Sequence, residues 1–186
     1  MSTAKPSKRK GTSQAASRII FVLGGAASGK SDVALRLAGA TTPKAFVATG
    51  QGLDDEMTAR IARHQAMRPS AWETVEVRLE LAPWFSGCGH RYRTIVMDCV
   101  TLWLSNLHGS RVTESAIVKR VSALLKAMRT TAARVVIVSN ELGLGLVPSA
   151  PSVRAFRDVA GRVNQQIAAE ADEVHLVVSG IPFQLK

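Results

Sequence analysis

The residues best suited to chemistry form the segment GGAASGKS at positions 24–31. It matches the pattern G-x-x-x-x-G-K-[ST], in which glycines let backbone N–H groups surround phosphate oxygens. Lys30 would reach the β- and γ-phosphates, and the Ser31 hydroxyl would bind Mg²⁺. An apolar run precedes the segment and a helical pattern follows it, which disfavours an ordinary glycine-rich turn. The sequence therefore predicts a site for a nucleoside triphosphate.

A second candidate is Asp98, which ends the apolar run TIVMD at positions 94–98. Taken alone, an aspartate at the end of a strand more often caps a turn or a helix. Beside a phosphate loop, the same position suits a carboxylate that holds or orients the metal ion of a nucleotide. Ser31 and Asp98 are thus the predicted Mg²⁺ ligands.

A third candidate is His64, in the segment RIARHQAMRP at positions 60–69. Acidic residues begin the predicted helix 54–65 and basic residues end it, which matches the helix dipole, so a solvated surface helix explains the pattern by itself. Near a triphosphate, a neutral imidazole could instead attack phosphorus and carry the transferred group as a phosphoramidate. The arginines around it would stabilise charge on that group and on departing pyrophosphate. Both interpretations stay open at this level.

These candidates need a scaffold, and five apolar runs rich in β-branched residues indicate strands over 18–25, 44–49, 93–99, 134–141 and 173–180. The runs are near-continuous rather than alternating, as expected of strands buried on both faces. Helical patterns lie between them, over 31–37, 54–65, 113–129 and 152–170. The alternation predicts an α/β fold with a mostly parallel sheet covered by helices on both faces. The segment PWFSGCGHR, 83–91, is expected to be a surface loop.

The length of 186 residues fits one compact domain. We expect residues 18–186 to form a single nucleotide-binding catalytic domain and residues 1–17, with four basic residues, to form a flexible extension. The formal net charge of +10 leaves a nucleotide-dependent nucleic-acid-binding module as an alternative, although the basic stretch lacks aromatic residues for stacking. No apolar run is long enough for a membrane span, and Cys88 and Cys99 have no metal-ligand spacing, so a cytoplasmic location is expected.

Several segments together resemble the bifunctional adenosylcobinamide kinase/adenosylcobinamide-phosphate guanylyltransferase family of cobalamin biosynthesis. They are, in order, GGAASGKS, VATGQGLDDEMTARIARHQAMRPSAWETVE, MDCVTLWLSNL, VIVSNELGLGLVPS and FRDVAGRVNQQIAAEADEVHLVVSGIP. The resemblance covers residues 18–186 and implies a P-loop NTPase-type, RecA-like fold. It also implies Mg²⁺ as the cofactor, a homotrimer, and no specific nucleic-acid partner.

The chemistry implied by the resemblance has two steps. ATP or GTP first phosphorylates the hydroxyl on the aminopropanol arm of adenosylcobinamide. GMP is then transferred from GTP to adenosylcobinamide phosphate through a guanylyl group on His64, which gives adenosylcobinamide-GDP and pyrophosphate. A P-loop small-molecule kinase without the guanylyltransferase step is the nearest alternative.

The resemblance also places the nucleotide contacts. Glu76 would recognise guanine, because a carboxylate can accept hydrogen bonds from the N1–H and the exocyclic amine of the base. The alternative is that Glu76 is an ordinary solvated residue of a strand or loop. Many relatives carry a bulkier basic residue where this chain has Ala27, and Asp98 replaces a frequent glutamate. Asn140 and Glu141 could face the nucleotide or the corrinoid, or cap a turn. The implied contacts are Gly24, Gly25, Ala26, Ala27, Ser28, Gly29, Lys30, Ser31, Thr49, Gly50, Gln51, Gln65, Ala66, Met67, Arg68, Glu76 and Asp98.

Overall fold

The computed structural model describes residues 17–186 apart from 53, 67 and 111, and at Arg60 it describes the backbone alone. The expected extension, 1–17, therefore lies outside the described residues except for Ser17. That residue is buried, and its carbonyl accepts a hydrogen bond of 2.9 Å from the Arg129 guanidinium.

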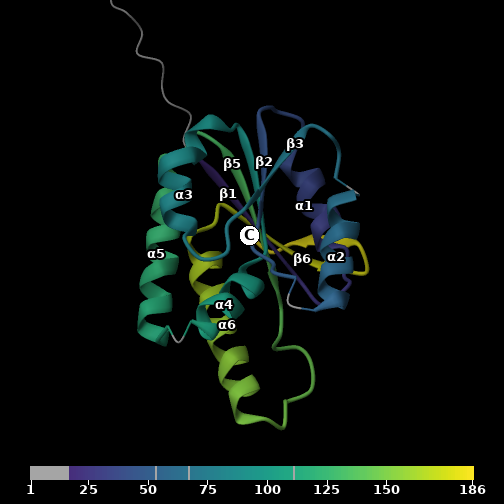
Figure 1. The fold of residues 1–186 in the computed structure, drawn as a ribbon, viewed down its shortest axis with the longest axis vertical. Helices are drawn as coiled ribbons and strands as arrows, with labels where there is room; N and C mark the ends of the chain where they lie inside the picture. Colours follow the sequence, from purple (N-terminus) through teal and green to yellow (C-terminus); the bar gives the residue numbers. More distant parts are fainter. Residues whose placement is uncertain (1–16, 53, 67, 111) are drawn as a thin grey trace, which may run out of the picture.

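A seven-stranded sheet runs through the centre of the molecule in the order β3-β2-β4-β5-β1-β6-β7 (Figure 1). Every neighbouring pair is parallel except β6 and β7, which are antiparallel. The mostly parallel sheet predicted from the sequence is thus confirmed. The strands are β1 (Arg18–Gly24), β2 (Lys44–Ala48), β3 (Trp72–Glu76), β4 (Thr94–Asp98), β5 (Arg134–Asn140), β6 (Glu173–Val178) and β7 (Ile181–Gln184).

The register of these strands brings polar residues to one edge. Asp98 pairs with Ala48 of β2, and Ala48 pairs with Glu76 of β3. On the other side, Gly24 at the end of β1 pairs with Asn140 at the end of β5. Because parallel strands share a direction, their carboxyl ends meet at the same edge of the sheet.

Helices cover both faces of the sheet, as predicted. One hydrophobic cluster includes Trp103, Val121 and Val163 and joins the sheet to α3, α4, α5 and α6. A smaller cluster, with Val33 and Phe46, joins the opposite face to α1. The helices are α1 (Lys30–Ala38), α2 (Asp55–Ala66), α3 (Leu81–Cys88), α4 (Val100–Gly109), α5 (Glu114–Thr130) and α6 (Pro151–Glu170), with a short 3₁₀ turn η1 (Gly89–Arg91).

The segment 83–91 is not a surface loop, and that prediction was wrong. It contains most of α3 and all of η1. Leu81 and Phe85, four residues apart, are fully buried against the sheet, and Pro83 lies in the first helical turn, where a missing N–H is tolerated. Trp84 stacks on Tyr92 with ring centroids 5.9 Å apart. The glycines and the proline made the segment read as a loop, but the helix is stabilised by the packing of its apolar side chains.

Three further elements were not predicted. Strand β3 is short and buries only Trp72, so its sequence reads as polar. Helix α4 begins just after β4, and its first residues are mostly apolar, so in the sequence they read as a continuation of the apolar strand. Strand β7 returns from β6 through Ser179 and Gly180, both of which have a positive φ. Among the described residues, no helix combines the length and the apolar composition that crossing a bilayer requires.

Candidate nucleotide-binding site

The phosphate loop connects the end of β1 at Gly24 to the start of α1 at Lys30. Gly29 has φ +83°, and a Cβ there would lie 3.1 Å from the Cα of Gly180. A Cβ at Gly24 would lie 2.8 Å from the carbonyl oxygen of Val177. Both positions require glycine, since the first needs a left-handed conformation and the second a close approach to backbone.

Lys30 is the first residue of α1 and is only 8% exposed. Its Nζ donates a hydrogen bond of 2.9 Å to the carbonyl oxygen of Gly25, across the loop. The ammonium is therefore held inside the curve of the loop, beside the N–H groups at the start of α1. This arrangement concentrates positive charge where the phosphates of a nucleotide would bind.

The predicted metal ligands are in direct contact. The Ser31 hydroxyl donates a hydrogen bond of 2.8 Å to the Oδ2 atom of Asp98, so the shorter aspartate still reaches the serine. No group of three or more His, Cys, Asp or Glu side chains suited to a metal ion occurs in the described part of the chain. A hydroxyl and one carboxylate fit Mg²⁺, which takes oxygen ligands and completes its shell with phosphate oxygens and water.

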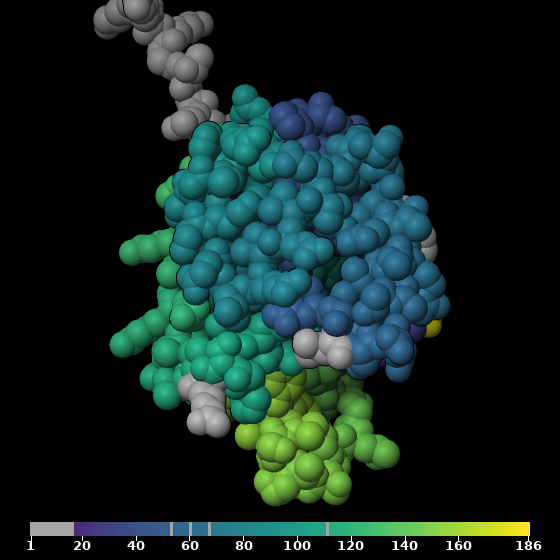
Figure 2. Space-filling model, viewed as in Figure 1, coloured from purple at the N-terminus to yellow at the C-terminus, as the bar shows by residue number. Residues whose placement is uncertain are grey.

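Two adjoining cavities open beside the loop. An inner cavity of about 150 Å³ contains Glu76, Asp98 and Asn140 in its wall, and an outer cavity of about 480 Å³ is lined by 26–32 and Arg63. We call the two together the P-loop cleft. A recess is visible beside α2 in Figure 2. The two cavities share Lys30, Ser31, Phe46, His64 and Arg68.

His64 lies in the last turn of α2, and its side chain is exposed. It lines both cavities, so the helix end faces the same space as Lys30 and Ser31. Met57 and Ile61, two half-buried residues of this helix, form part of the wall of the inner cavity. The structure thus brings the candidate nucleophile and the phosphate loop to one cleft.

Arg68 is fixed at the boundary between the cavities. Its guanidinium carbon lies 3.6 Å from the centre of the Phe46 ring, and Nη1 donates to the Thr74 hydroxyl at 3.1 Å. Burial lowers the pKa of Arg68, and this effect outweighs the charge of Asp98, which raises it. The guanidinium remains charged at neutral pH. Together with Arg63 it supplies positive charge to the outer cavity, where Ala27 supplies none.

Glu76 ends β3 and lines the inner cavity. Its carboxylate is half exposed and lies 3.6 Å from the Arg78 guanidinium, so it is not sequestered by an internal partner. Phe46, Ile61 and Leu102 provide apolar surface in the same cavity. An apolar pocket with one carboxylate at its edge can hold a flat base and accept hydrogen bonds from it.

Other predicted contacts are placed differently. The side chain of Thr49 is fully buried, and its hydroxyl donates to the Cys99 carbonyl at 2.7 Å and accepts from the Cys99 N–H at 2.8 Å. This threonine therefore joins β2 to the start of α4 and does not reach the cleft. Gly50 lines the inner cavity, whereas Gln51 and Ala66 line neither cavity. Met67 lies outside the described residues.

Sequence reasoning missed Asn106. Its Nδ2 donates to the carbonyl of Thr49 at 2.8 Å and to that of Arg78 at 3.0 Å, which ties together the segments that follow β2 and β3. The one available signal was a polar residue within the apolar segment WLSNL. Phe46 and Leu102 were also missed, because apolar residues in a cleft look like core residues in a sequence.

The fold and the site define a P-loop nucleoside-triphosphate-binding protein with a RecA-like sheet. The fold agrees with that of a KaiC-like protein from Pyrococcus horikoshii, with a TM-score of 0.51 over 86% of this chain and 70% of that one, at 11% sequence identity.

Residues 20–185 match the family described as cobinamide kinase/cobinamide phosphate guanyltransferase. The chain belongs to this family, which confirms the resemblance noted from its motifs. It is 42% identical over 180 residues to the bifunctional adenosylcobalamin biosynthesis protein CobU of Escherichia coli K12, covering 90% of this chain and 99% of that protein. The protein of the same name from Salmonella typhimurium LT2 is 41% identical, with the same coverage.

Proposed function

We propose that this protein phosphorylates adenosylcobinamide and then transfers GMP to the product through His64. The observation that carries the proposal is the shared cleft: His64 lines the same two cavities as Lys30 and Ser31. Phosphoryl transfer at a phosphate loop needs no histidine, whereas a histidine that lines the same cleft permits a second, nucleotidyl transfer.

In the kinase step, Lys30 and the N–H groups at the start of α1 hold the β- and γ-phosphates of ATP or GTP. Ser31 and Asp98 would hold Mg²⁺, which would neutralise charge on the phosphates when bound. The substrate hydroxyl attacks the γ-phosphorus, and the bond from that phosphorus to the β–γ bridging oxygen breaks. The residues of this chain act mainly by positioning and by electrostatic stabilisation.

In the second step, a ring nitrogen of neutral His64 attacks the α-phosphorus of GTP. The bond from that phosphorus to the α–β bridging oxygen breaks, and pyrophosphate leaves. Arg63 and Arg68 would stabilise the charge that develops on it, since both line the outer cavity. A phosphate oxygen of adenosylcobinamide phosphate then attacks the same phosphorus and releases His64.

Specificity for guanine in this step is assigned to Glu76. Its carboxylate would accept hydrogen bonds from the N1–H and the exocyclic amine, and adenine has no such pair of donors on that edge. The exposure of Glu76 at the rim of an apolar cavity supports this role. A homotrimer is part of the proposal on the resemblance alone, and a cytoplasmic location is part of it on the apolar runs and the cysteines of the sequence.

Incubation with GTP labelled on the α-phosphate tests the nucleophile. We expect an Mg²⁺-dependent, acid-labile label on the wild-type protein and none on His64→Ala, because a phosphoramidate hydrolyses in acid. His90→Ala is the matched control, since His90 is also exposed but lies outside the P-loop cleft. A label that persists in His64→Ala would exclude His64 as the nucleophile. A wild-type protein that takes no label but has normal kinase activity would show that the protein is a kinase without the guanylyltransferase step.

A further inference from the structure

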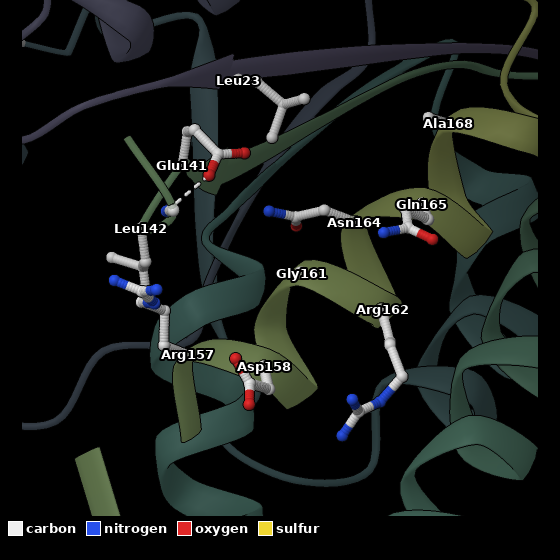
Figure 3. Close-up of a pocket in the computed structure, with 11 residues that line it drawn as sticks. Leu23, Glu141, Leu142, Arg157, Asp158, Gly161, Arg162, Asn164, Gln165 and Ala168 are labelled. Carbon is white, nitrogen blue, oxygen red and sulfur yellow. Dashed lines mark hydrogen bonds between the residues drawn. The ribbon is translucent and has the colours of Figure 1, made fainter. Parts of the chain in front are cut away.

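A third cavity, of about 500 Å³, lies between the ends of β1 and β5 and helix α6 (Figure 3). Its wall includes Leu23 of β1, Glu141 just after β5, and one face of α6 around Gly161. We call it the α6 pocket. It shares no lining residue with the P-loop cleft, and the steps proposed above do not use it.

The α6 pocket and the P-loop cleft meet at one short stretch of chain. Asn140 lines the inner cavity of the cleft, and its neighbour Glu141 lines the α6 pocket. The backbone N–H of Glu141 donates to the carbonyl of Gly24 at 3.0 Å, at the start of the phosphate loop. The pocket therefore begins directly beside the loop that would hold the triphosphate.

A buried hydrogen-bond network makes this boundary rigid. The Ser139 hydroxyl donates to the side chain of Asn164 on α6 at 2.8 Å, and the Nδ2 of Asn164 donates to the Asn140 carbonyl at 3.1 Å. The N–H of Asn140 donates to the Thr101 hydroxyl at 3.0 Å. Asn164 is buried, and both the oxygen and the nitrogen of its side-chain amide form hydrogen bonds. The spacing between the α6 pocket and the P-loop cleft is therefore fixed.

The Glu141 carboxylate is oriented within this frame. Its Oε1 accepts the N–H of Gly143 at 2.6 Å, which leaves Oε2 for another partner. In Figure 3, Glu141 lies at the end of the pocket next to Leu23, whereas Arg157 and Asp158 lie at the far end. Glu141 is thus the carboxylate of the pocket nearest to the phosphate loop.

We propose that the α6 pocket holds the alcohol substrate of the kinase step, with Glu141 as its general base; the inference rests on the proposed kinase function. The hydroxyl gives its proton to Oε2 of Glu141 while its oxygen forms the bond to the γ-phosphorus, and the nucleoside diphosphate leaves.

The polar groups of the pocket suit an acceptor that carries carboxamides. The side chains of Asp158 and Gln165 have no hydrogen-bond or ion-pair partner among the residues that the structure describes, and they line the wall beyond Glu141. An amide periphery offers both donors and acceptors to such a carboxylate and amide. The polar lining of the pocket therefore fits the amide-bearing alcohol of the proposed kinase step, a cobinamide.

Two variants test the proposal with adenosylcobinamide and ATP. Glu141→Gln keeps the shape of the side chain but removes the base, so kcat of the kinase step should fall about 100-fold or more. Gly161→Phe places a ring in the pocket, because a Cβ at Gly161 meets no atom within 4 Å, and should raise KM for adenosylcobinamide at least tenfold. Ala169→Phe adds the same bulk at an exposed position of α6 outside the pocket and should change neither constant.

Labelling by α-labelled GTP is measured on every variant and should stay within about threefold of wild type. Kinase activity of Glu141→Gln within threefold of wild type would overturn the role of Glu141. An unchanged KM in Gly161→Phe would exclude the pocket as the substrate site. If the wild-type protein phosphorylates adenosylcobinamide but takes no label, the proposed transfer through His64 fails while these kinase measurements still decide the present inference.

Discussion

At the scale of single residues, the cleft places reactive groups and inert ones side by side. Cys99 follows the metal-ligand candidate Asp98 directly, but its thiol is buried. Burial raises the pKa of Cys99 to about 12, and the charge of Asp98 adds to the effect. The thiol is therefore neutral and takes no part in the chemistry at physiological pH, although it lines the inner cavity.

This shift has a consequence for stability above pH 9. In the unfolded chain the thiol ionises near its ordinary value of 9.0, whereas in the folded chain it stays protonated to about 12. The unfolded state is thus favoured progressively as the pH rises between these values, by about 1.4 kcal/mol per pH unit. We expect wild type to lose more stability than Cys99→Ala in urea unfolding between pH 8 and pH 10.5.

The control for this measurement is Cys88→Ala, because Cys88 is the other free thiol and is only partly buried. Its pH profile should follow that of wild type. Parallel profiles for wild type and Cys99→Ala would show that the Cys99 thiol is not protected in the folded state.

Single residues also show what the sequence could reveal about the site. The phosphate loop with Ser31 follows a fixed local pattern, and Asp98 could be placed near it because it ends a recognisable apolar strand; the two side chains are in contact. The burial of the Thr49 hydroxyl and the position of Asn106 depend on contacts with residues 50 and 57 positions away along the chain. No local pattern carries such information, so these roles appeared only in the structure.

At the scale of elements, prediction succeeded where burial alone defines the element. The five predicted strands are buried on both faces, so their sequences are apolar throughout. Strand β3 and helix α3 failed for opposite reasons: β3 is mostly exposed, and α3 contains glycine and proline yet packs well. Their formation depends on neighbours that a local window does not contain.

Asp172 links the ends of several elements at the amino-terminal edge of the parallel strands, away from the phosphate loop. The Oδ2 atom of Asp172 accepts from the N–H of Ile19 on β1 at 2.7 Å and from the Arg129 guanidinium of α5 at 2.6 Å. Desolvation raises the pKa of Asp172, but the hydrogen bonds from Arg129 and Ile19 and the nearby positive charges outweigh it, and the pKa is lowered. The ionised carboxylate thus helps to join β1, α5 and β6.

We expect Asp172→Asn to lower the free energy of unfolding by roughly 1 kcal/mol at pH 7, a modest value because the ion pair is partly exposed. A lowered native pKa stabilises the fold above the unfolded value of 3.8, and this contribution is lost as the pH falls further. Chemical denaturation should therefore show the same difference from wild type at pH 7 and pH 5 and a smaller difference at pH 3.5.

Asp158→Asn serves as the comparison, because Asp158 is exposed and has no ion pair among the described residues. Its stability should equal that of wild type at each pH. A difference between Asp172→Asn and wild type that is constant from pH 7 to pH 3.5 would contradict the role of the ionised carboxylate.

At the scale of the whole molecule, the two proposed reactions depend on the same phosphate loop. The cavities of the P-loop cleft share Lys30, Ser31, His64 and Arg68. ATP for the kinase step and GTP for the labelling of His64 should then bind in competition. We expect added ATP to raise the apparent KM for GTP in the labelling of His64 without changing the maximal rate, as measured by initial rates with α-labelled GTP.

AMP, which lacks the phosphates that the loop holds, is the control and should compete far more weakly. A fall in the maximal labelling rate at saturating GTP would mean that ATP binds elsewhere.

A shared phosphate loop also fixes the order of events in time. One chain cannot phosphorylate an alcohol and accept GMP at the same moment, because the spent nucleoside diphosphate must dissociate before GTP enters. The exchange of nucleotides then sets an upper limit on the rate of the complete conversion. In a mixture of the two triphosphates, their ratio would divide the molecules between the two reactions, so the supply of purine nucleotides would regulate this enzyme without a separate regulatory site.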